Sequence, residues 1–253
     1  MKKRYYDILG EKYAIPCVEY APDGEAAKGV IIALHGFGGD KESSAVFRLA
    51  EKAVKHDLAV VCIDFPAHGK STADERFLTV ENCKNDVETT YAFVENDFFD
   101  AGNGSGKIHF FATSFGGYIL AHVLEKPLYK SSKAVFRSPA VNMAETFVEK
   151  ICNLTIVELA KRDFAECGFE RKLKLNYDFY ADLEKHNIRD VSFDNKCLMI
   201  YGDRDTVVRP QDMEAFAAVR PNITVKCIEG ADHRYKGEGH LELAVRYAVD
   251  FLK

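Results

Sequence analysis

Several features that would assign a function class at once are missing from this sequence. It has no run of about 18 apolar residues, the length that a membrane-spanning helix requires. Its lysines and arginines are scattered, and a net charge of −5 argues against a partner held through nucleic-acid phosphates. It also has no internal repeat and no low-complexity tract. We therefore expect neither a nucleic-acid partner nor a membrane partner.

Motifs for common cofactors are missing as well. The glycine-rich stretch His35–Gly39 lacks the Lys-Ser or Lys-Thr pair of a phosphate-binding loop, and no G-x-G-x-x-G follows a first strand. The cysteines are odd in number and include no C-x-x-C pair, which fits neither a zinc site nor a disulfide framework. We therefore expect no cofactor, no metal, and cysteines that are all reduced. The cysteines are Cys17, Cys62, Cys83, Cys152, Cys167, Cys197 and Cys227.

The composition is that of an ordinary globular protein. Of 253 residues, 47% are hydrophobic and 29% are charged, a balance that allows a sizeable core. The N-terminal Met-Lys-Lys-Arg is followed by Tyr5, Tyr6 and Asp7 instead of the apolar segment of a signal peptide. We therefore expect a cytoplasmic protein. Nothing in the sequence indicates an oligomeric state.

Short apolar runs alternate with segments of helical periodicity along most of the chain. Strands that alternate with helices predict parallel crossovers and a sheet covered on both faces. An N-terminal pair of strands predicts a hairpin at the edge of that sheet. The predicted strands are 5–9, 13–20, 29–34, 58–65, a strand before Ser114, 133–137, 196–201 and 223–228, and the main helices are 43–55, 80–99, 212–219 and 241–252.

The alternation pauses between residues 141 and 193, where helical stretches carry many aromatic side chains. We interpret this segment as a lid inserted into a single α/β domain that spans residues 1–253. A lid packs its apolar side on the domain beneath it and leaves a few side chains over the site. The alternative is that these aromatics form the buried faces of additional helices.

Residues 107–120 form a strand pattern that stops at Ser114 and becomes a helix pattern. In a nucleophile elbow the serine lies at the tip of such a turn, flanked by small residues because larger ones would collide with the strand and helix. Ala112, Gly116 and Gly117 occupy those positions. The usual pattern is G-x-S-x-G, so Ala112 departs from it. The alternative is an ordinary turn that leads into a helix.

A serine hydroxyl needs a base to take its proton and a third group to orient that base. The order Ser, Asp, His along the chain belongs to α/β-hydrolases, and acidic residues and His233 follow the later predicted strands. Loops that leave the carboxyl ends of parallel strands gather at one edge of the sheet. Asp203, Asp205 and Asp232 are the candidate acids, and His240, at the start of the last predicted helix, is the alternative base.

These features identify a resemblance to serine hydrolases of the α/β-hydrolase superfamily over nearly the whole chain. The His35–Gly39 loop, the Asp64–Ser71 loop and the modest lid after the sixth strand are similar to those of cinnamoyl and feruloyl esterases. They also recur in monoacylglycerol lipases and serine aminopeptidase-like hydrolases. The resemblance implies an α/β-hydrolase fold with a mostly parallel central sheet and helices on both faces.

The resemblance also implies a role for individual residues. Ser114 matches the nucleophile and His233 the general base. Asp205 matches the triad acid better than Asp203, because the acid of the family precedes a Thr-Val-Val-like run. The backbone N–H groups of Phe37 and Phe115 match the oxyanion hole. The resemblance thus predicts a complete set of groups for acyl transfer.

Two further histidines are given structural roles. His35 should support the glycine-rich loop, and the Asp64–Ser71 loop should shape the pocket wall without a catalytic role for His68.

We expect a serine carboxylic ester hydrolase that acts on small aryl or short to medium acyl esters, including cinnamoyl or feruloyl esters. A lipase, thioesterase or peptidase would use the same triad. A hydrolase-fold protein that only binds a small ligand is the alternative from another class, and Ala112 favours it. The lid aromatics that we expect to contact substrate are Phe147, Phe164, Tyr177 and Tyr180.

Overall fold

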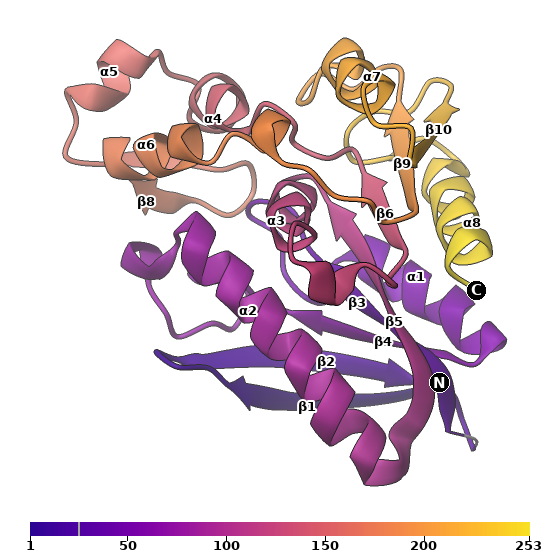
Figure 1. The fold of residues 1–253 in the computed structure, drawn as a ribbon. Coiled ribbons are helices and arrows are strands. Elements are labelled where there is room, and N and C mark those ends of the chain that lie inside the picture. Colours follow the sequence, from indigo (N-terminus) through magenta and orange to yellow (C-terminus); the bar gives the residue numbers. More distant parts are fainter. Residues whose placement is uncertain (25) are drawn as a thin grey trace.

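The computed structural model describes residues 1–24 and 26–253, and the side chains of all of these except 97 and 100–105. Its centre is an eight-stranded sheet in the order β1-β2-β4-β3-β5-β6-β9-β10 (Figure 1). The first two strands form the predicted N-terminal hairpin, and β2 is antiparallel to β4. From β4 to β10 all neighbours are parallel. The strands are β1 Lys2–Leu9, β2 Ala14–Ala21, β3 Ala27–Leu34, β4 Leu58–Ile63, β5 Gly104–Thr113, β6 Ala134–Arg137, β9 Cys197–Gly202 and β10 Ile223–Ile228.

Helices cover both faces of this sheet, which explains why its central strands contain long apolar runs, such as the whole of β4. Ile32 of β3 faces one core layer and Ile31 faces the other. Helices α2, α3 and α7 contribute to the first layer, and α1 and α8 to the second (Figure 1). The bounds are α1 Ser44–Ala53, α2 Val80–Phe93, α3 Phe115–Val123, α7 Pro210–Ala218 and α8 His240–Leu252.

Helix α2 is shorter than predicted. Thr79 begins it, because its side chain accepts a hydrogen bond from the Asn82 amide. Regular α geometry ends at Phe93 and gives way to a π-helical stretch, Val94–Asn103. The short 3₁₀ turns of the chain are Val54–His56, Glu75–Phe77, Pro127–Tyr129 and Ile188–Asp190.

The segment between β6 and β9 projects from one end of the sheet, above α2 and α3 in Figure 1. It is helical in part, as predicted, but it also contains a short antiparallel hairpin that the helical pattern did not predict. Each hairpin strand has only three residues, too few for a visible alternation. The elements are α4 Met143–Thr146, a π-helical stretch Phe147–Cys152, α5 Ile156–Ala160, β7 Ala165–Cys167, β8 Leu173–Leu175 and α6 Tyr177–Lys185.

The expectation that all cysteines are reduced is wrong for one pair. Cys152 and Cys167 form a disulfide that joins the π-helical stretch to β7. The two residues stand far apart in sequence, so the pattern gave no spacing to recognise, and only the folding back of β7 brings their Cα atoms to 4.3 Å. The other cysteines are free.

Within the described residues, no helix combines the length and the apolar composition needed to cross a membrane.

Candidate active site

Ser114 lies at the turn between the end of β5 and the start of α3. Its backbone has φ 51° and ψ −114°, a conformation that residues other than glycine adopt only when their surroundings hold them there. The Ser114 amide donates to the carbonyl of Arg137 at 3.0 Å, and its carbonyl accepts from the amides of Tyr118 and Ala140, each at 3.1 Å. The hydroxyl is thereby carried to the carboxyl-terminal edge of the sheet.

The small residues around Ser114 are required by close packing, as the sequence predicted. A Cβ on Gly116 would lie 2.6 Å from the carbonyl oxygen of His35, and one on Gly117 would lie 3.0 Å from Pro139 Cβ. Ala112 is different because it belongs to β5 and is fully buried without a positive φ. The position needs a small residue, and alanine fits it.

His233 lies between the other two members of the predicted triad. Its Nε2 is 3.1 Å from Ser114 Oγ, and its Nδ1 is 2.7 Å from Asp205 Oδ2. A carboxylate only accepts hydrogen bonds, so Nδ1 donates to Asp205. Nε2 of the neutral ring is then the acceptor for the Ser114 hydroxyl. This is the tautomer that a general base needs.

The carboxylate of Asp205 is held by its own loop after β9. Its Oδ1 accepts hydrogen bonds from the amides of Val207 and Val208, both at 2.9 Å. The side chain is fully shielded from solvent. Both oxygens therefore have partners, and the orientation of the carboxylate toward His233 is fixed.

The alternative acids and base lie in other contacts. Asp203 accepts a hydrogen bond from the Gly230 amide at 2.6 Å, and Asp232 accepts one from the Lys236 amide at 2.9 Å. His240 is the first residue of α8, and its ring lies against Gly237. Among the described residues, only Asp205 is hydrogen-bonded to His233 Nδ1.

The two amides predicted for the oxyanion hole come from different elements. Phe115 is the first residue of α3, where an N–H has no acceptor inside the helix. Phe37 lies in a turn closed by a 3.0 Å hydrogen bond from the Gly39 amide to the Gly36 carbonyl. A Cβ on Gly36 would lie 3.3 Å from Ser114 Cβ, so this turn stands directly beside the nucleophile.

Two buried histidines support the Phe37 turn. His35 Nε2 accepts a hydrogen bond from the Phe65 amide at 3.2 Å, so its Nδ1 carries the proton and donates to the Gly36 carbonyl at 2.8 Å. Burial lowers the pKa of His35 and lowers that of His68 to about 3, so both rings are neutral near pH 7. The His68 ring packs against His35 and Phe37.

Asp64 anchors the same turn, and the sequence gave it no individual role. Its carboxylate accepts hydrogen bonds from the Lys41 amide, the Lys41 ammonium and the Lys70 amide, each at 2.7 Å. Lys41 follows the Phe37 turn, whereas Asp64 follows β4. Gly69 allows this approach, because a Cβ there would lie 2.1 Å from Asp64 Cγ. The buried ion pair therefore joins two loops of the candidate site.

The four predicted lid aromatics have different surroundings. The Phe147 ring is fully buried and lies 6.2 Å from that of Phe37, between ring centroids. Tyr177 and Tyr180 contact each other, 5.4 Å apart. Phe164 is half exposed and lies under the Lys174 ammonium. Of the four, only Phe147 has a ring contact with Phe37.

Phe179 of α6, which the sequence did not single out, is the other aromatic of residues 141–193 whose ring contacts Phe37. Its ring centroid is 6.3 Å from that of Phe37 and 4.9 Å from that of Phe147. It also lines a hollow of about 320 Å³ together with Phe164. Its helical spacing with Leu183, another buried residue of α6, was the available signal.

The turn between β7 and β8 reaches the loops that carry the site. Arg171 donates to the Gly69 carbonyl at 3.2 Å, and a Cβ on Gly38 would lie 3.7 Å from the Arg171 carbonyl oxygen. On the other side, Glu170 forms an ion pair with Arg234, the residue after His233. The turn therefore extends from the Phe37 loop to the His233 loop.

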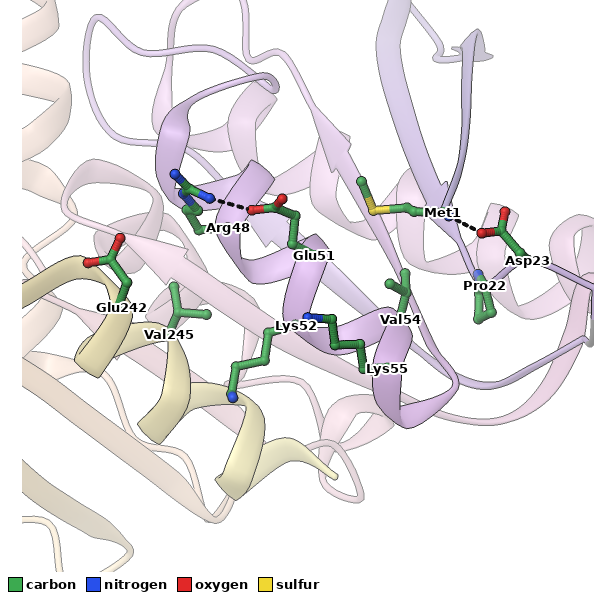
Figure 2. Close-up of a pocket in the computed structure, with 10 residues that line it drawn as sticks. All are labelled: Met1, Pro22, Asp23, Arg48, Glu51, Lys52, Val54, Lys55, Glu242 and Val245. Carbon is green, nitrogen blue, oxygen red and sulfur yellow. Dashed lines mark hydrogen bonds and ion pairs between the residues drawn. The ribbon is translucent and has the colours of Figure 1, made fainter. Parts of the chain in front are cut away.

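A separate hollow of about 690 Å³ lies between the N-terminus, α1 and α8 (Figure 2). It contains none of the residues predicted for the site, and its charged side chains are partly paired, Arg48 with Glu51 and the Met1 amine with Asp23. The described residues also contain no group of three His, Cys, Asp or Glu side chains placed to hold a metal ion.

A family model described as "Serine aminopeptidase, S33" matches residues 25–177. Est1E from Butyrivibrio proteoclasticus, solved with ferulic acid bound, is similar with a TM-score of 0.83 and 20% identity, over 97% of each chain. An alpha-beta serine hydrolase homologue from Coxiella burnetii has a TM-score of 0.69 and 19% identity, over 100% of this chain and 99% of that one. Alpha/beta hydrolase domain-containing protein 10 from mouse has a TM-score of 0.75 and 15% identity, over 98% of each chain.

No curated protein matches the sequence significantly. At these identities the solved structures bear on the fold alone, and they confirm the predicted α/β-hydrolase fold.

Proposed function

This chain belongs to the serine aminopeptidase S33 family and is a serine hydrolase of the α/β-hydrolase fold, and on that premise we propose that it cleaves carboxylic esters through an acyl-enzyme. The observation that carries the proposal is the hydrogen-bonded line from Ser114 through His233 to Asp205. A positive φ at Ser114 adds to it, because backbone strain persists where function requires a particular geometry.

The mechanism follows from the tautomer of His233. As Ser114 Oγ attacks the acyl carbon, its proton moves to His233 Nε2, and the new imidazolium is stabilised by the Asp205 carboxylate. His233 then gives that proton to the leaving alkoxide oxygen, which departs as an alcohol and leaves an ester on Ser114. A water molecule, deprotonated by His233 in turn, attacks this ester, and the acid leaves as His233 returns that proton to Ser114 Oγ.

The oxyanion that forms in each tetrahedral intermediate would accept hydrogen bonds from the amides of Phe37 and Phe115. Such donors act without reorganisation because the backbone already holds them, and one of them contributes about 3 kcal/mol to lowering the barrier. The buried pair of Lys41 and Asp64 supports this role for Phe37, because it fixes the loop that follows the turn.

We propose that residues 141–193 act as a lid on a single α/β domain and that its aromatics select the acyl group. Phe147 and Phe179 add apolar surface beside Phe37 and suit an aryl or short to medium acyl chain. The bound ferulic acid of the similar Est1E makes cinnamoyl and feruloyl esters the first substrates to test. The other predicted lid aromatics are less favoured as contacts of the acyl group; these are Phe164, Tyr177 and Tyr180.

The test compares hydrolysis of methyl ferulate and p-nitrophenyl butyrate by the wild type and by Ser114→Ala. We expect turnover of both esters and a loss of more than about 10⁴-fold in kcat in the variant. If only the nitrophenyl ester is cleaved, the proposed esterase activity stands and the proposed preference for feruloyl esters falls. If the wild type cleaves neither ester but binds ferulate as tightly as Ser114→Ala does, the protein is a ligand-binding relative.

A peptidase is the second candidate, and the description of the matching family favours it. The same triad attacks an amide, with His233 protonating a leaving amine in place of an alcohol. Alanine p-nitroanilide, assayed beside alanine p-nitrophenyl ester, separates the two activities. A ratio of kcat/KM that favours the anilide would replace the esterase proposal.

The cytoplasmic location expected from the sequence has one observation against it. Disulfides such as Cys152–Cys167 are rare in cytosolic proteins and persist in oxidising compartments. Mass spectrometry after thiol alkylation of rapidly quenched cells shows whether Cys152 and Cys167 are thiols or a disulfide in the cell. We expect both cysteines to be alkylated if the protein is cytoplasmic.

A further inference from the structure

Arg137, the last residue of β6, is buried in a way that calls for an explanation. Its side chain is 5% exposed, and it takes part in none of the ion pairs among the described residues. Its Nε is buried without a hydrogen-bond partner. A buried charge is costly unless it is paired and hydrogen-bonded. The fold therefore keeps a guanidinium at a position where an apolar side chain would pack at lower cost.

The contacts of Arg137 join the two loops that meet at the candidate triad. Its Nη1 donates to Thr113 Oγ1 at 3.2 Å, and its carbonyl accepts the amide of Ser114. On its other side, the guanidinium carbon lies 4.3 Å from the ring centroid of Tyr235. Tyr235 belongs to the His233 loop and has a positive φ of 57°. Arg137 thus links the residue before the nucleophile to the loop of the base.

The ring of Tyr235 is fixed from behind. Its hydroxyl is hydrogen-bonded to Ser138 at 3.1 Å and to the Ile200 carbonyl at 3.2 Å. Burial raises the pKa of Tyr235 to about 12, so the ring is neutral at working pH. The guanidinium therefore lies on a rigid and uncharged face, and its contact with Tyr235 holds the His233 loop in place.

The charge of Arg137 is not isolated from the charges of the candidate triad. Burial lowers the pKa of Arg137, while Tyr235, Asp205 and Asp232 act against that shift. Beside His233, Arg234 is paired with Glu170 of the β7–β8 turn. The triad acid Asp205 is therefore one of the charges that act on Arg137.

We propose that Arg137 is a positioning residue of the triad, which holds the His233 loop against the Ser114 turn and sets the charge balance around Asp205. This inference rests on the proposed function. Removing the Arg137 guanidinium would both release the His233 loop and take away the buried positive charge that acts on Asp205.

The test uses Arg137→Gln, which removes the charge but keeps an N–H donor for Thr113, and Arg137→Lys, which keeps the charge. The first readout is the pH profile of kcat/KM for p-nitrophenyl butyrate. The second is the titration of His233, followed by NMR of ¹³C-labelled histidine and assigned with a His233→Asn variant. The NMR readout needs no turnover, so failure of the esterase proposal leaves this test intact.

Arg220 provides a matched control. Its guanidinium carbon lies 3.8 Å from the Phe216 ring centroid, its N–H groups donate to backbone carbonyls, and burial lowers its pKa too. It contacts no member of the triad among the described residues. Arg220→Gln therefore removes a similar arginine from a place where it cannot act on His233.

We expect Arg137→Gln to lower kcat by at least about tenfold and to move the His233 titration, with the acidic limb of kcat/KM, upward by about half a unit to one unit. Arg137→Lys should lower kcat but leave the titration near that of the wild type, and Arg220→Gln should leave both unchanged. A folded Arg137→Gln protein whose titration coincides with that of the wild type would overturn the proposal.

A second variant covers the case in which Arg137→Gln does not fold. Thr113→Val removes the hydrogen bond of the guanidinium and keeps its charge, so kcat should fall while the His233 titration stays in place. Wild-type kcat in Thr113→Val would refute the positioning role.

Discussion

Asp64→Asn is the substitution that most directly tests how the candidate site is held together. Asp64 is 1% exposed and receives the Lys41 ammonium together with two backbone amides. Asparagine has nearly the same shape, but its one oxygen can accept from only one of the two amides, because these bond to different oxygens of Asp64. It removes the negative charge, so the ammonium of Lys41, which is itself 3% exposed, is left without an anion.

The expected cost is that of an uncompensated buried charge, about 3–5 kcal/mol. That is a large part of the 5–15 kcal/mol that typically separates folded from unfolded protein. With a urea slope of about 3 kcal/mol per molar, the upper end for small proteins, the midpoint of unfolding should fall by more than about 1 M. Because Lys41 follows the Phe37 turn, kcat for ester hydrolysis should also fall, by about tenfold or more.

Urea unfolding followed by circular dichroism measures the first quantity, and initial rates with p-nitrophenyl butyrate measure the second. The control is Glu42→Gln, which breaks the neighbouring Lys3–Glu42 pair, whose side chains are 36% and 38% exposed. An exposed pair contributes less than about 1 kcal/mol, so this variant should unfold near the wild-type midpoint. If Asp64→Asn and Glu42→Gln have the same midpoint, the buried pair is not what stabilises these loops.

Three further changes have expected outcomes. Burial raises the pKa of Asp86 to about 7, so between pH 4 and pH 7 the folded protein retains a proton that the unfolded chain has lost, and stability falls as pH rises through that window. In Asp86→Asn this loss, up to about 4 kcal/mol, should be absent when the free energy of unfolding is measured in urea at pH 4.5 and at pH 8. The same change of that free energy with pH in the wild type and the variant would contradict the prediction. Replacing Cys152 and Cys167 by serine should lower the free energy of unfolding by about 3 kcal/mol, because the disulfide spans a sequence separation of 15 residues, and a dithiol reductant should have no further effect on the variant. Gly116→Ala would bring a methyl group 2.6 Å from the His35 carbonyl oxygen, so kcat should fall at least about a hundredfold, and full activity would show that α3 can shift away.

The architecture could be predicted from the sequence because its signals are local. Residues 29–34 of β3 and the whole of β4 are continuous apolar runs, and a Gly-rich or acidic loop follows several of the parallel strands. Parallel strands leave their carboxyl ends at one edge, so the separation of Ser114, Asp205 and His233 in sequence does not prevent their meeting. The small residues after Ser114 marked the turn for the same local reason.

Some structural features were not predicted because their sequence signals are short or involve residues far apart along the chain. The hairpin of β7 and β8 has strands of three residues, too short for alternation to be recognised. The disulfide depends on that hairpin, because only the return of the chain brings Cys167 to Cys152. Phe147 and Phe179 both lie in helical patterns. They pack on Phe37 because of the helix face that each one occupies.

The sequence by itself determined which elements form, their order, and the residue types available at the ends of the strands, because backbone propensity and apolar periodicity act over a few neighbouring residues. The tertiary structure decided which of three nearby aspartates meets His233, that Asp64 receives Lys41, and that the buried Arg137 guanidinium lies against Tyr235 of the His233 loop. These are matters of distance between residues far apart along the chain. Charge and hydrogen-bond energies fall steeply with distance, so they are settled only when the sheet has brought the loops together.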